Sequence, residues 1–247
     1  MKTSEVRKEF INLFEKLAQK YSRYQIWSDF IIMSACAISN ACDRQFFDVR
    51  EKMYMDCVKK YSREEAEIFP EMLSLVVIAF DINPEQDFLG EIFGALRLHN
   101  EWHGQFFTPY NIAKFMAEIN VGGIVQDIKE KGTVSVSDCC CGAGCLLIAF
   151  ANSVNRAGAN YQKSILFAAQ DIDLIAGLMC YIQLSVLGCK GYIKIGDSLT
   201  EPITTDSVID ETFWFTPMYK MGNLLTFMQL FDETKNDNNR QESDVSE

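Results

Sequence analysis

Residues 134–147 read Val-Ser-Val-Ser-Asp-Cys-Cys-Cys-Gly-Ala-Gly-Cys-Leu-Leu, and this stretch decides the fold. Its alternating valines, which lead to an acid, predict a short strand, and the two glycines predict a tight turn. The apolar residues from Leu146 onward have helical spacing. Glycine suits the turn because it adopts positive φ and lets a ligand approach the backbone. A strand, a glycine turn and a helix in this order form the junction that holds nucleotide-like ligands in α/β proteins.

The glycine turn departs from the dinucleotide fingerprint, because a third glycine would fall at position 147, which is Leu147. No Gly-Lys-Ser/Thr follows, so the turn is not a phosphate-binding loop of that kind either. An acid before the glycines suits a ligand that carries an ammonium group or hydroxyls better than one that carries phosphates. S-adenosylmethionine is such a ligand.

Composition and charge narrow the class of protein. The chain has 247 residues, of which 48% are hydrophobic, enough for one large domain or two small ones. Its formal net charge of −11 argues against a stand-alone DNA binder, which would present a basic face. Contact with DNA through a partner subunit remains open. No segment reaches the roughly 18 uncharged apolar residues of a membrane helix, so we expect no membrane insertion.

The cysteines favour a reducing compartment. There are nine of them, three are consecutive, and the charged start of the chain does not look like a secretory signal. We therefore expect a cytoplasmic protein. Cys139, Cys140, Cys141 and Cys145 raise the question of a zinc site, but their spacing is not a pair of C-x2-C motifs. We expect no metal there, and interpret these residues as small packing residues of a buried loop.

The pattern changes along the chain. Residues 1–100 predict a helical domain, with helices near 6–21, 26–41, 46–58 and 88–98 and one that Ser62 opens and Pro70 interrupts. From Thr133, strands at 133–137, 164–169 and 192–195 alternate with helices at 144–154 and 174–187. Such alternation predicts an α/β fold with a parallel sheet over residues 101–231. Residues 232–247 are mostly polar and acidic, and predict a disordered tail.

Three acids follow the three predicted strands, namely Asp138, Asp171 and Asp197. Because the carboxyl ends of parallel strands share one edge of the sheet, we expect the acids to line one crevice. Asp171 stands where an acid accepts hydrogen bonds from ribose hydroxyls. Asp197 could accept a hydrogen bond from an exocyclic amine.

Upstream lies Gly104-Gln-Phe-Phe-Thr-Pro-Tyr-Asn111. Thr108 predicts a helix N-cap and Pro109 a first helical residue. The N-terminus of this helix could bind a carboxylate. The helix then carries four large apolar residues on one face, namely Ile112, Phe115, Met116 and Ile119.

Taken together, these motifs resemble the N6-adenine DNA methyltransferases, and most of all the modification subunits of type I restriction-modification systems. The residues that carry the resemblance, over about 87–203, are Asp87-Phe-Leu-Gly-Glu91, Gln105-Phe-Phe-Thr-Pro109, Asp138-x-x-Cys-Gly-x-Gly144, Gln170-Asp-Ile-Asp173 and Gly196-Asp-Ser-Leu199. The resemblance implies a helical N-terminal domain before a Rossmann-like S-adenosylmethionine-dependent methyltransferase fold.

Carried over position by position, the resemblance implies a cofactor site. Thr108 would hold the methionine carboxylate, Asp171 the ribose and Asp197 the adenine. The loop residues Asp138, Gly142 and Gly144 would surround the methionine part. Neighbouring residues of the same motifs complete the implied site, namely Phe107, Ile172 and Ser198. Cys139 and Cys145 replace a common proline and a common glycine of the family's loop.

The family's catalytic motif, Asn/Asp-Pro-Pro-Tyr/Phe, has no counterpart, because the chain contains no Pro-Pro pair. The nearest region is 210–219, in which Asp210, Phe215 and Tyr219 are the weak candidates for an alternative arrangement that holds a flipped base. Little chain follows this region, so we expect a truncated fold without the remaining strands or a target-recognition domain.

Three hypotheses follow. The chain is a compact methyltransferase that methylates adenine in DNA, completed by a partner subunit. Alternatively it is a non-catalytic protein that uses the cofactor site for regulation or assembly, or a decayed relative with an empty pocket. Homo- and hetero-oligomers are both open.

Overall fold

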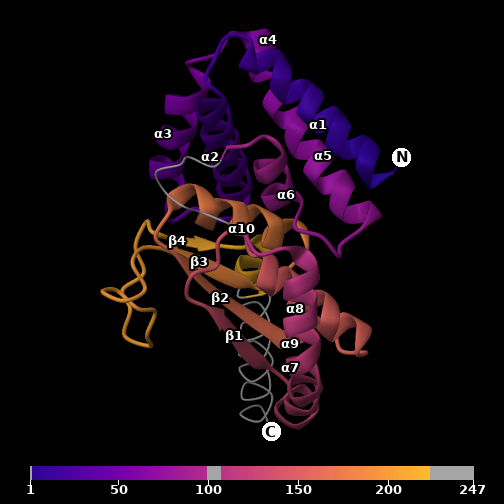
Figure 1. The fold of residues 1–247 in the computed structure, drawn as a ribbon. Helices are drawn as coiled ribbons and strands as arrows, with labels where there is room; N and C mark the ends of the chain where they lie inside the picture. Colours follow the sequence, from indigo (N-terminus) through magenta and orange to yellow (C-terminus); the bar gives the residue numbers. More distant parts are fainter. Residues whose placement is uncertain (1, 99–106, 223–247) are drawn as a thin grey trace, which may run out of the picture.

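The computed structural model describes residues 2–98 and 107–222 (Figure 1). The predicted tail at 232–247, the boundary near residue 100, and Gly104 to Phe106 of the upstream motif lie outside the described residues. Helices make up the first part of the chain, and none in the described part is long and apolar enough to cross a membrane. They are α1 (Thr3–Ala18), α2 (Arg23–Cys42), α3 (Phe47–Val58), α4 (Arg63–Ala66), α5 (Ile68–Ile82) and α6 (Phe88–Ala95).

The break between α4 and α5 follows from local chemistry. The Ser62 hydroxyl accepts a hydrogen bond from Glu65 N, and the Glu65 carboxylate accepts one from Ser62 N at 2.8 Å, which completes the predicted capping box. The chain leaves the helix at Glu67, and α5 begins directly afterwards. Pro70 therefore lies in the first turn of α5, where its missing N–H costs no hydrogen bond.

The sheet has the order β1-β2-β3-β4. β1 (Val134–Asp138), β2 (Ile165–Asp171) and β3 (Gly191–Ile195) are parallel, as expected, and are joined through α8 (Cys145–Arg156) and α10 (Leu174–Val186). A short helix, α9 (Tyr161–Ser164), precedes β2. β4 (Phe213–Phe215) departs from the all-parallel expectation, because it pairs with β3 in the antiparallel direction. The loop 196–212 begins and ends at the carboxyl end of β3, so β4 can run back along the outer edge of β3 in the opposite direction.

Helix α7 (Tyr110–Lys131) packs on α8 and contacts β1. Its small residues Ala113 and Ala117 are buried on the packed face. The predicted apolar face points the other way, because the four large side chains on it are exposed, namely Ile112, Phe115, Met116 and Ile119. The helix is therefore apolar on two sides, and only one of them is used within the described residues.

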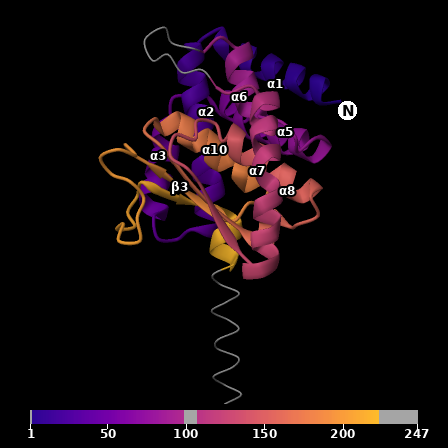
Figure 2. The ribbon, with the colours of Figure 1, turned by 60° about the horizontal axis from the view of Figure 1, so that its bottom comes forward.

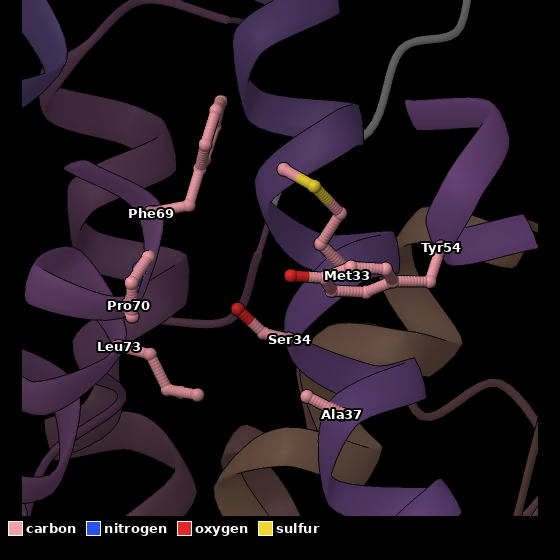
Figure 3. Close-up of a pocket in the computed structure, with 7 residues that line it drawn as sticks. All are labelled: Met33, Ser34, Ala37, Tyr54, Phe69, Pro70 and Leu73. Atoms are coloured by element: carbon pink, nitrogen blue, oxygen red, sulfur yellow. The ribbon is translucent and has the colours of Figure 1, made fainter. Parts of the chain in front are cut away.

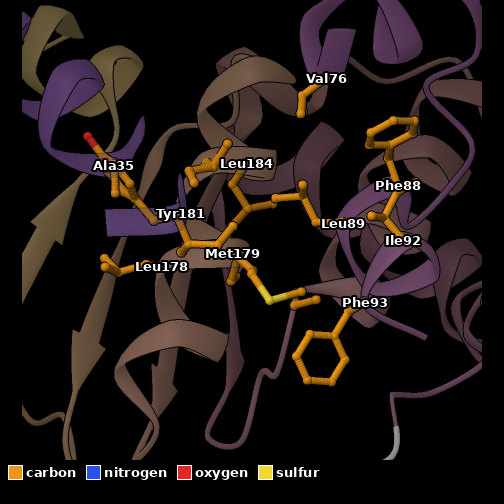
Figure 4. Close-up of a cluster of buried hydrophobic side chains, with 14 of the residues drawn as sticks. Ala35, Val76, Phe88, Leu89, Ile92, Phe93, Leu178, Met179, Tyr181 and Leu184 are labelled. Atoms are coloured by element: carbon orange, nitrogen blue, oxygen red, sulfur yellow. The ribbon is translucent and has the colours of Figure 1, made fainter. Parts of the chain in front are cut away.

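One cluster of buried side chains joins the helical part to the sheet part. Figure 4 shows its middle, where residues of α6 such as Phe88 and Leu89 approach Met179 and Leu184 of α10. Helix α2 also packs along α10, so the N-terminal helices rest on the helical layer of the sheet (Figure 1).

A buried polar cluster ties α2 and α3 to β4. Arg50 of α3 donates to the Ser39 hydroxyl, to Asp43 Oδ2 at 3.0 Å and to the Phe213 carbonyl at 2.6 Å. Its guanidinium also lies 4.3 Å from the centre of the Trp214 ring. Burial alone would raise the pKa of Asp43, but hydrogen bonds from Lys220 and Arg50 hold that pKa below its ordinary value. The cluster thus fixes β4 against the helices.

Candidate functional site

The backbone of the glycine loop requires both of its glycines. Gly142 has φ of +53° and Gly144 has φ of +90°, a region that other residues enter only at a cost. A Cβ on Gly142 would lie 3.2 Å from the Phe107 ring, and one on Gly144 would lie 2.8 Å from Cys180 Sγ of α10. The loop therefore packs closely between the segment before α7 and helix α10.

Asp171 holds the loop from the end of β2. Its Oδ2 accepts a hydrogen bond from Gly142 N at 2.7 Å, and its Oδ1 accepts one from Asp173 N at 2.9 Å. The Asp171 carbonyl accepts a further bond from Gly196 N at 2.9 Å. One half-buried acid thus connects the glycine loop, the start of α10 and the loop after β3. Each carboxylate oxygen can accept more than one hydrogen bond, so capacity remains for a ligand's hydroxyls.

Asp138 lies on the neighbouring strand at the same edge. Its carboxylate accepts a hydrogen bond from Cys140 N at 3.2 Å, which shapes the first turn of the loop. Burial raises the pKa of Asp138, and the negative charge of Asp171 raises it further. The mutual influence of the two acids agrees with their positions on adjacent parallel strands. A cationic group between them would be favoured, because it would offset this repulsion.

Hydrogen bonds from side chains of β2 and β3 hold the loop after β3 in place. Asp197 Oδ1 accepts a hydrogen bond from Leu199 N, and Ser198 next to it is half-buried. Gln170 of β2 donates to the carbonyls of Gly196 and Glu201, and Lys194 of β3 donates to the same Glu201 carbonyl at 2.7 Å. Asp197 follows β3 in the chain, so it lies at the same edge of the sheet as Asp138 and Asp171.

A second support of the glycine loop comes from Gln183 of α10. This buried amide donates to the Ala143 carbonyl at 2.7 Å and to Asp87 Oδ1 at 2.8 Å, and it accepts from Leu89 N. Burial raises the pKa of Asp87 to about 6, despite the hydrogen bonds from Gln183 and Gly90. Gln183 was not predicted from the sequence, although a lone amide in an otherwise apolar helix is a signal that could have identified it.

The remaining residues of the predicted site lie just before α7 and just after β2. Phe107 lies against Gly142 and makes an edge contact with Phe93 of α6. Thr108 is not the helix N-cap as expected, because α7 begins one residue later and its N-cap is Pro109, without a side-chain cap. Ile172 is 71% exposed, directly beside Asp171.

The three alternative catalytic residues are not brought together: Asp210 lies near the carboxyl end of β3, and Phe215 and Tyr219 lie near its start. Asp210 is exposed and accepts a hydrogen bond from Thr212 N in the loop before β4. Phe215 is buried and stacks on Tyr219, with ring centres 4.9 Å apart. Because β4 runs antiparallel to β3, Phe215 lies beside Tyr192, near the start of β3. Phe215 and Tyr219 therefore lie toward the amino-terminal end of the sheet, apart from Asp210, and a role of the three residues in holding a flipped base stays a prediction.

Cavities at two other places do not coincide with the glycine loop. One of about 60 Å³ lies between α2, α3 and α5, lined by Met33, Tyr54 and Phe69 among others, and is too small for a cofactor (Figure 3). A larger one of about 470 Å³ lies at the amino-terminal ends of β1 and β2, lined by Thr133, Ile165 and Tyr219 among others. Ligands of parallel α/β sheets bind at the opposite edge.

The cysteines of the loop divide into two kinds. Cys141 and Cys145 are buried, as expected for packing residues, whereas Cys139 and Cys140 are exposed. Among residues 2–98 and 107–222, no group of three or more metal-ligating side chains is arranged to hold an ion.

A protein described as a class I S-adenosylmethionine-dependent methyltransferase from Listeria monocytogenes is similar at 14% identity and a TM-score of 0.46, over 85% of this chain and 56% of that one. The type I restriction-modification system methyltransferase subunit from Streptococcus thermophilus is similar at 11% identity and a TM-score of 0.46, over 84% and 61%. This chain thus spans less than two thirds of either protein.

No curated protein sequence matches the chain. The family described as N-6 DNA Methylase matches residues 85–238, which is more than half of the 247 residues and contains the glycine loop and all three acids. The chain therefore belongs to the N-6 DNA methylase family.

Proposed function

We propose that this chain binds S-adenosylmethionine at the carboxyl edge of β1, β2 and β3. The observation that carries the proposal is the double role of Asp171, which holds Gly142 N at 2.7 Å and still presents acceptor capacity at the edge. Family membership supports the same cofactor.

The residues of the edge fit the parts of this cofactor. The acids Asp138 and Asp171 suit its ammonium and its ribose hydroxyls, and Asp197 suits the adenine amine. The first N–H groups of α7, after Thr108, have no acceptor within the helix and suit a carboxylate. Phe107 packs beside Gly142, where a Cβ would lie 3.2 Å from its ring, so glycine is needed for the loop to keep this shape. Bound S-adenosylmethionine would supply an electrophilic methyl group.

Calorimetric titration with S-adenosylmethionine and with its demethylated product tests the proposal. Asp171→Ala removes the ribose acceptor and also releases Gly142, so affinity should fall roughly a hundredfold, since hydrogen bonds to a charged group contribute ~1.5–3 kcal/mol each. Asp206→Ala, an exposed acid in the loop before β4, is the matched control and should leave affinity unchanged. Absence of binding by the wild-type chain, or an unchanged affinity in Asp171→Ala, would overturn the assignment.

Methyl transfer to DNA is proposed to need a partner subunit. The chain contains no Pro-Pro pair, and the aromatic candidates Phe215 and Tyr219 lie away from the glycine loop. The net charge of −11 also opposes approach to phosphates. Purified alone, the chain should therefore bind cofactor and transfer little or no labelled methyl to mixed DNA. Robust labelling of adenine by the isolated chain would contradict this and favour a self-sufficient enzyme.

A further inference from the structure

Two buried polar residues that lie outside the proposed cofactor contacts connect helix α6 to the glycine loop. Asp87 is the N-cap of α6, and Gln183 lies in α10, which runs beside α6 in both Figures 1 and 2. Asp87 belongs to the motif Asp87-Phe-Leu-Gly-Glu91, to which the proposed function gives no role. A buried carboxyl or amide is costly unless hydrogen bonds satisfy it, so the partners of these two residues show what they hold in place.

The amide of Gln183 joins the first turn of α6 to the glycine loop. Its Nε2 donates to Asp87 Oδ1 at 2.8 Å and to the Ala143 carbonyl at 2.7 Å, and its Oε1 accepts from Leu89 N at 3.0 Å. The amide has one orientation, because a flipped amide would aim its oxygen at two acceptors and its N–H groups at a donor. Gln183 therefore sets the position of the Ala143 carbonyl relative to α6.

Asp87 is fixed in turn by the start of α6. Its Oδ1 also accepts a hydrogen bond from Gly90 N at 2.9 Å, as an N-cap side chain does. The carboxyl lies so close over Gly90 that a Cβ there would come 2.6 Å from Asp87 Cγ. The spacing of the acid and the glycine in the motif is therefore what allows Asp87 to cap the helix and meet Gln183 with the same oxygen.

These bonds fix the peptide group between Ala143 and Gly144. The Ala143 carbonyl accepts from Gln183, and Gly144 N donates to the Cys141 carbonyl at 2.8 Å. Because a peptide group is planar, hydrogen bonds at both of its ends leave it a single orientation. The glycines on either side, Gly142 and Gly144, restrict backbone rotation least of all residues. Without the bond from Gln183, the loop backbone would therefore change its shape easily.

A second contact leads from α6 to the glycine loop. The ring of Phe93 in α6 meets the ring of Phe107 edge-on, with ring centres 5.2 Å apart, and Phe107 packs beside Gly142. Helix α6 thus reaches the loop by a polar route and by an apolar one. Since α6 is packed among the N-terminal helices, the shape of the loop depends on that part of the chain.

We propose that Asp87 and Gln183 are positioning residues for the methionine part of S-adenosylmethionine, and that the N-terminal helices are thereby a necessary part of the cofactor site. The inference rests on the proposed function. Neither residue touches the ligand, because both act through the Ala143 carbonyl and the peptide group that follows it.

The effect should be confined to one part of the ligand. The proposed ribose acceptor, Asp171, is also held by Asp173 N, and the proposed adenine acceptor, Asp197, is held by Leu199 N. These bonds do not involve Gln183. Loss of the Gln183 amide should therefore weaken the contacts with the amino-acid part of the ligand and leave those with the adenosine part largely unchanged.

Calorimetric titration of the full chain with two ligands tests the inference. S-adenosylhomocysteine carries the amino-acid part, and 5′-methylthioadenosine lacks it. Gln183→Met keeps the length of the side chain but removes its donor and its acceptor. It should weaken S-adenosylhomocysteine by about tenfold or more and change methylthioadenosine by less than about twofold. Asp87→Ala should give the same pattern, whereas Asp87→Asn keeps an oxygen for Gln183 and should bind both ligands within about twofold of the wild type.

Leu184→Ala is the matched control, because it removes a buried side chain of α10 near α6 and leaves the bonds of Gln183 in place (Figure 4). It should lower the stability of the protein and leave the ratio of the two affinities unchanged. If Gln183→Met does not fold, the comparison of Asp87→Ala with Asp87→Asn decides the inference. Equal losses of affinity for the two ligands, or an Asp87→Asn that binds as weakly as Asp87→Ala, would overturn the inference and leave the proposed function standing. A wild type that binds neither ligand would overturn both.

Discussion

Two polar networks in this protein use the same kinds of hydrogen bond, but they differ in how far they are buried. Around Arg50, both the guanidinium and Asp43 are about 1% exposed, and the partners are Ser39 of α2, the β4 backbone and Lys220, which pairs with Asp43. Around Asp171, the acid is half-buried and its partners are the backbone N–H groups of loops. The first network can only stabilise the fold. The second shapes loops and leaves acceptor capacity at the carboxyl edge, where we propose that the cofactor binds, so the two networks differ in exposure rather than in bond type.

Breaking the buried network should have the largest effect. Arg50→Ala leaves buried Asp43 with Lys220 as its remaining ion-pair partner and removes the contact with Trp214, so the free energy of unfolding should fall by about 3 kcal/mol. Urea denaturation measures the loss. Arg63→Ala is the control, because its side chain is 89% exposed and its ion pair with Glu67 should contribute under about 0.5 kcal/mol. Equal losses in the two variants would contradict the comparison.

Asp87 should give stability an unusual pH dependence. Burial raises its pKa to about 6 in the folded chain, against 3.8 for the ordinary carboxyl. The folded state therefore binds the proton more tightly than the unfolded state, and this group's contribution to stability falls as pH rises from about 4 to 6. The span of about two pKa units corresponds to roughly 3 kcal/mol.

Asp87→Asn provides the measurement, because it keeps an oxygen for Gly90 N and Gln183 and does not titrate. The difference in unfolding free energy between Asp87→Asn and the wild type should grow over this pH range and level off above it. A difference that stays constant between pH 4 and 7 would show that the Asp87 carboxyl is not perturbed.

Adding a single methyl group to Gly144 of the glycine loop should lower the free energy of unfolding. Gly144→Ala combines a φ of +90° with a Cβ only 2.8 Å from Cys180 Sγ, so we expect a loss of about 2–3 kcal/mol. Gly158→Ala is a matched control, since its φ is +86° but nothing lies within 4 Å of its Cβ. It should cost only the backbone strain of ~1–2 kcal/mol. Thermal or urea unfolding of both variants separates the cost of the contact with Cys180 from the cost of backbone strain. Equal losses of unfolding free energy would show that the Cys180 side chain moves aside without cost.

The sequence predicted the three parallel strands closely, because each combines β-branched or aromatic residues with an acid or glycine at its end. It did not predict β4, since Phe-Trp-Phe is too short to show alternation and its antiparallel pairing depends on where the loop 196–212 returns. Arg50 was also missed. Its helix, α3, contains several charged residues, and nothing local distinguishes the one that is buried.

Helix α7 shows where periodicity misleads. The spacing of Ile112, Phe115, Met116 and Ile119 predicts an apolar face, but alanines on the other side allow the close contact with α8, and this contact decides which face is buried. The acids at the strand ends were easier to place, because topology alone brings carboxyl ends to one edge. The side chains that hold the loops in place, such as Gln183, come from tertiary packing and could not be assigned by motif.

The smallest effect should come from Asp210. It is exposed, its carboxylate accepts hydrogen bonds from Thr212, two residues later, and the strand that follows it runs away from the carboxyl edge. Asp210→Ala should lower the free energy of unfolding by ~1 kcal/mol at most, because it removes local bonds of a surface turn. Its affinity for S-adenosylmethionine should stay within about twofold of the wild type, since twofold is ~0.4 kcal/mol and no bond links Asp210 to the loop. Titration calorimetry on both proteins measures this. A tenfold loss of affinity, or loss of a methyl transfer that the wild type performs, would place Asp210 at the site and show that loop 196–212 closes over the carboxyl edge. Loop 196–212 would then belong with the proposed ligand-binding network around Asp171 rather than with the structural parts of the protein.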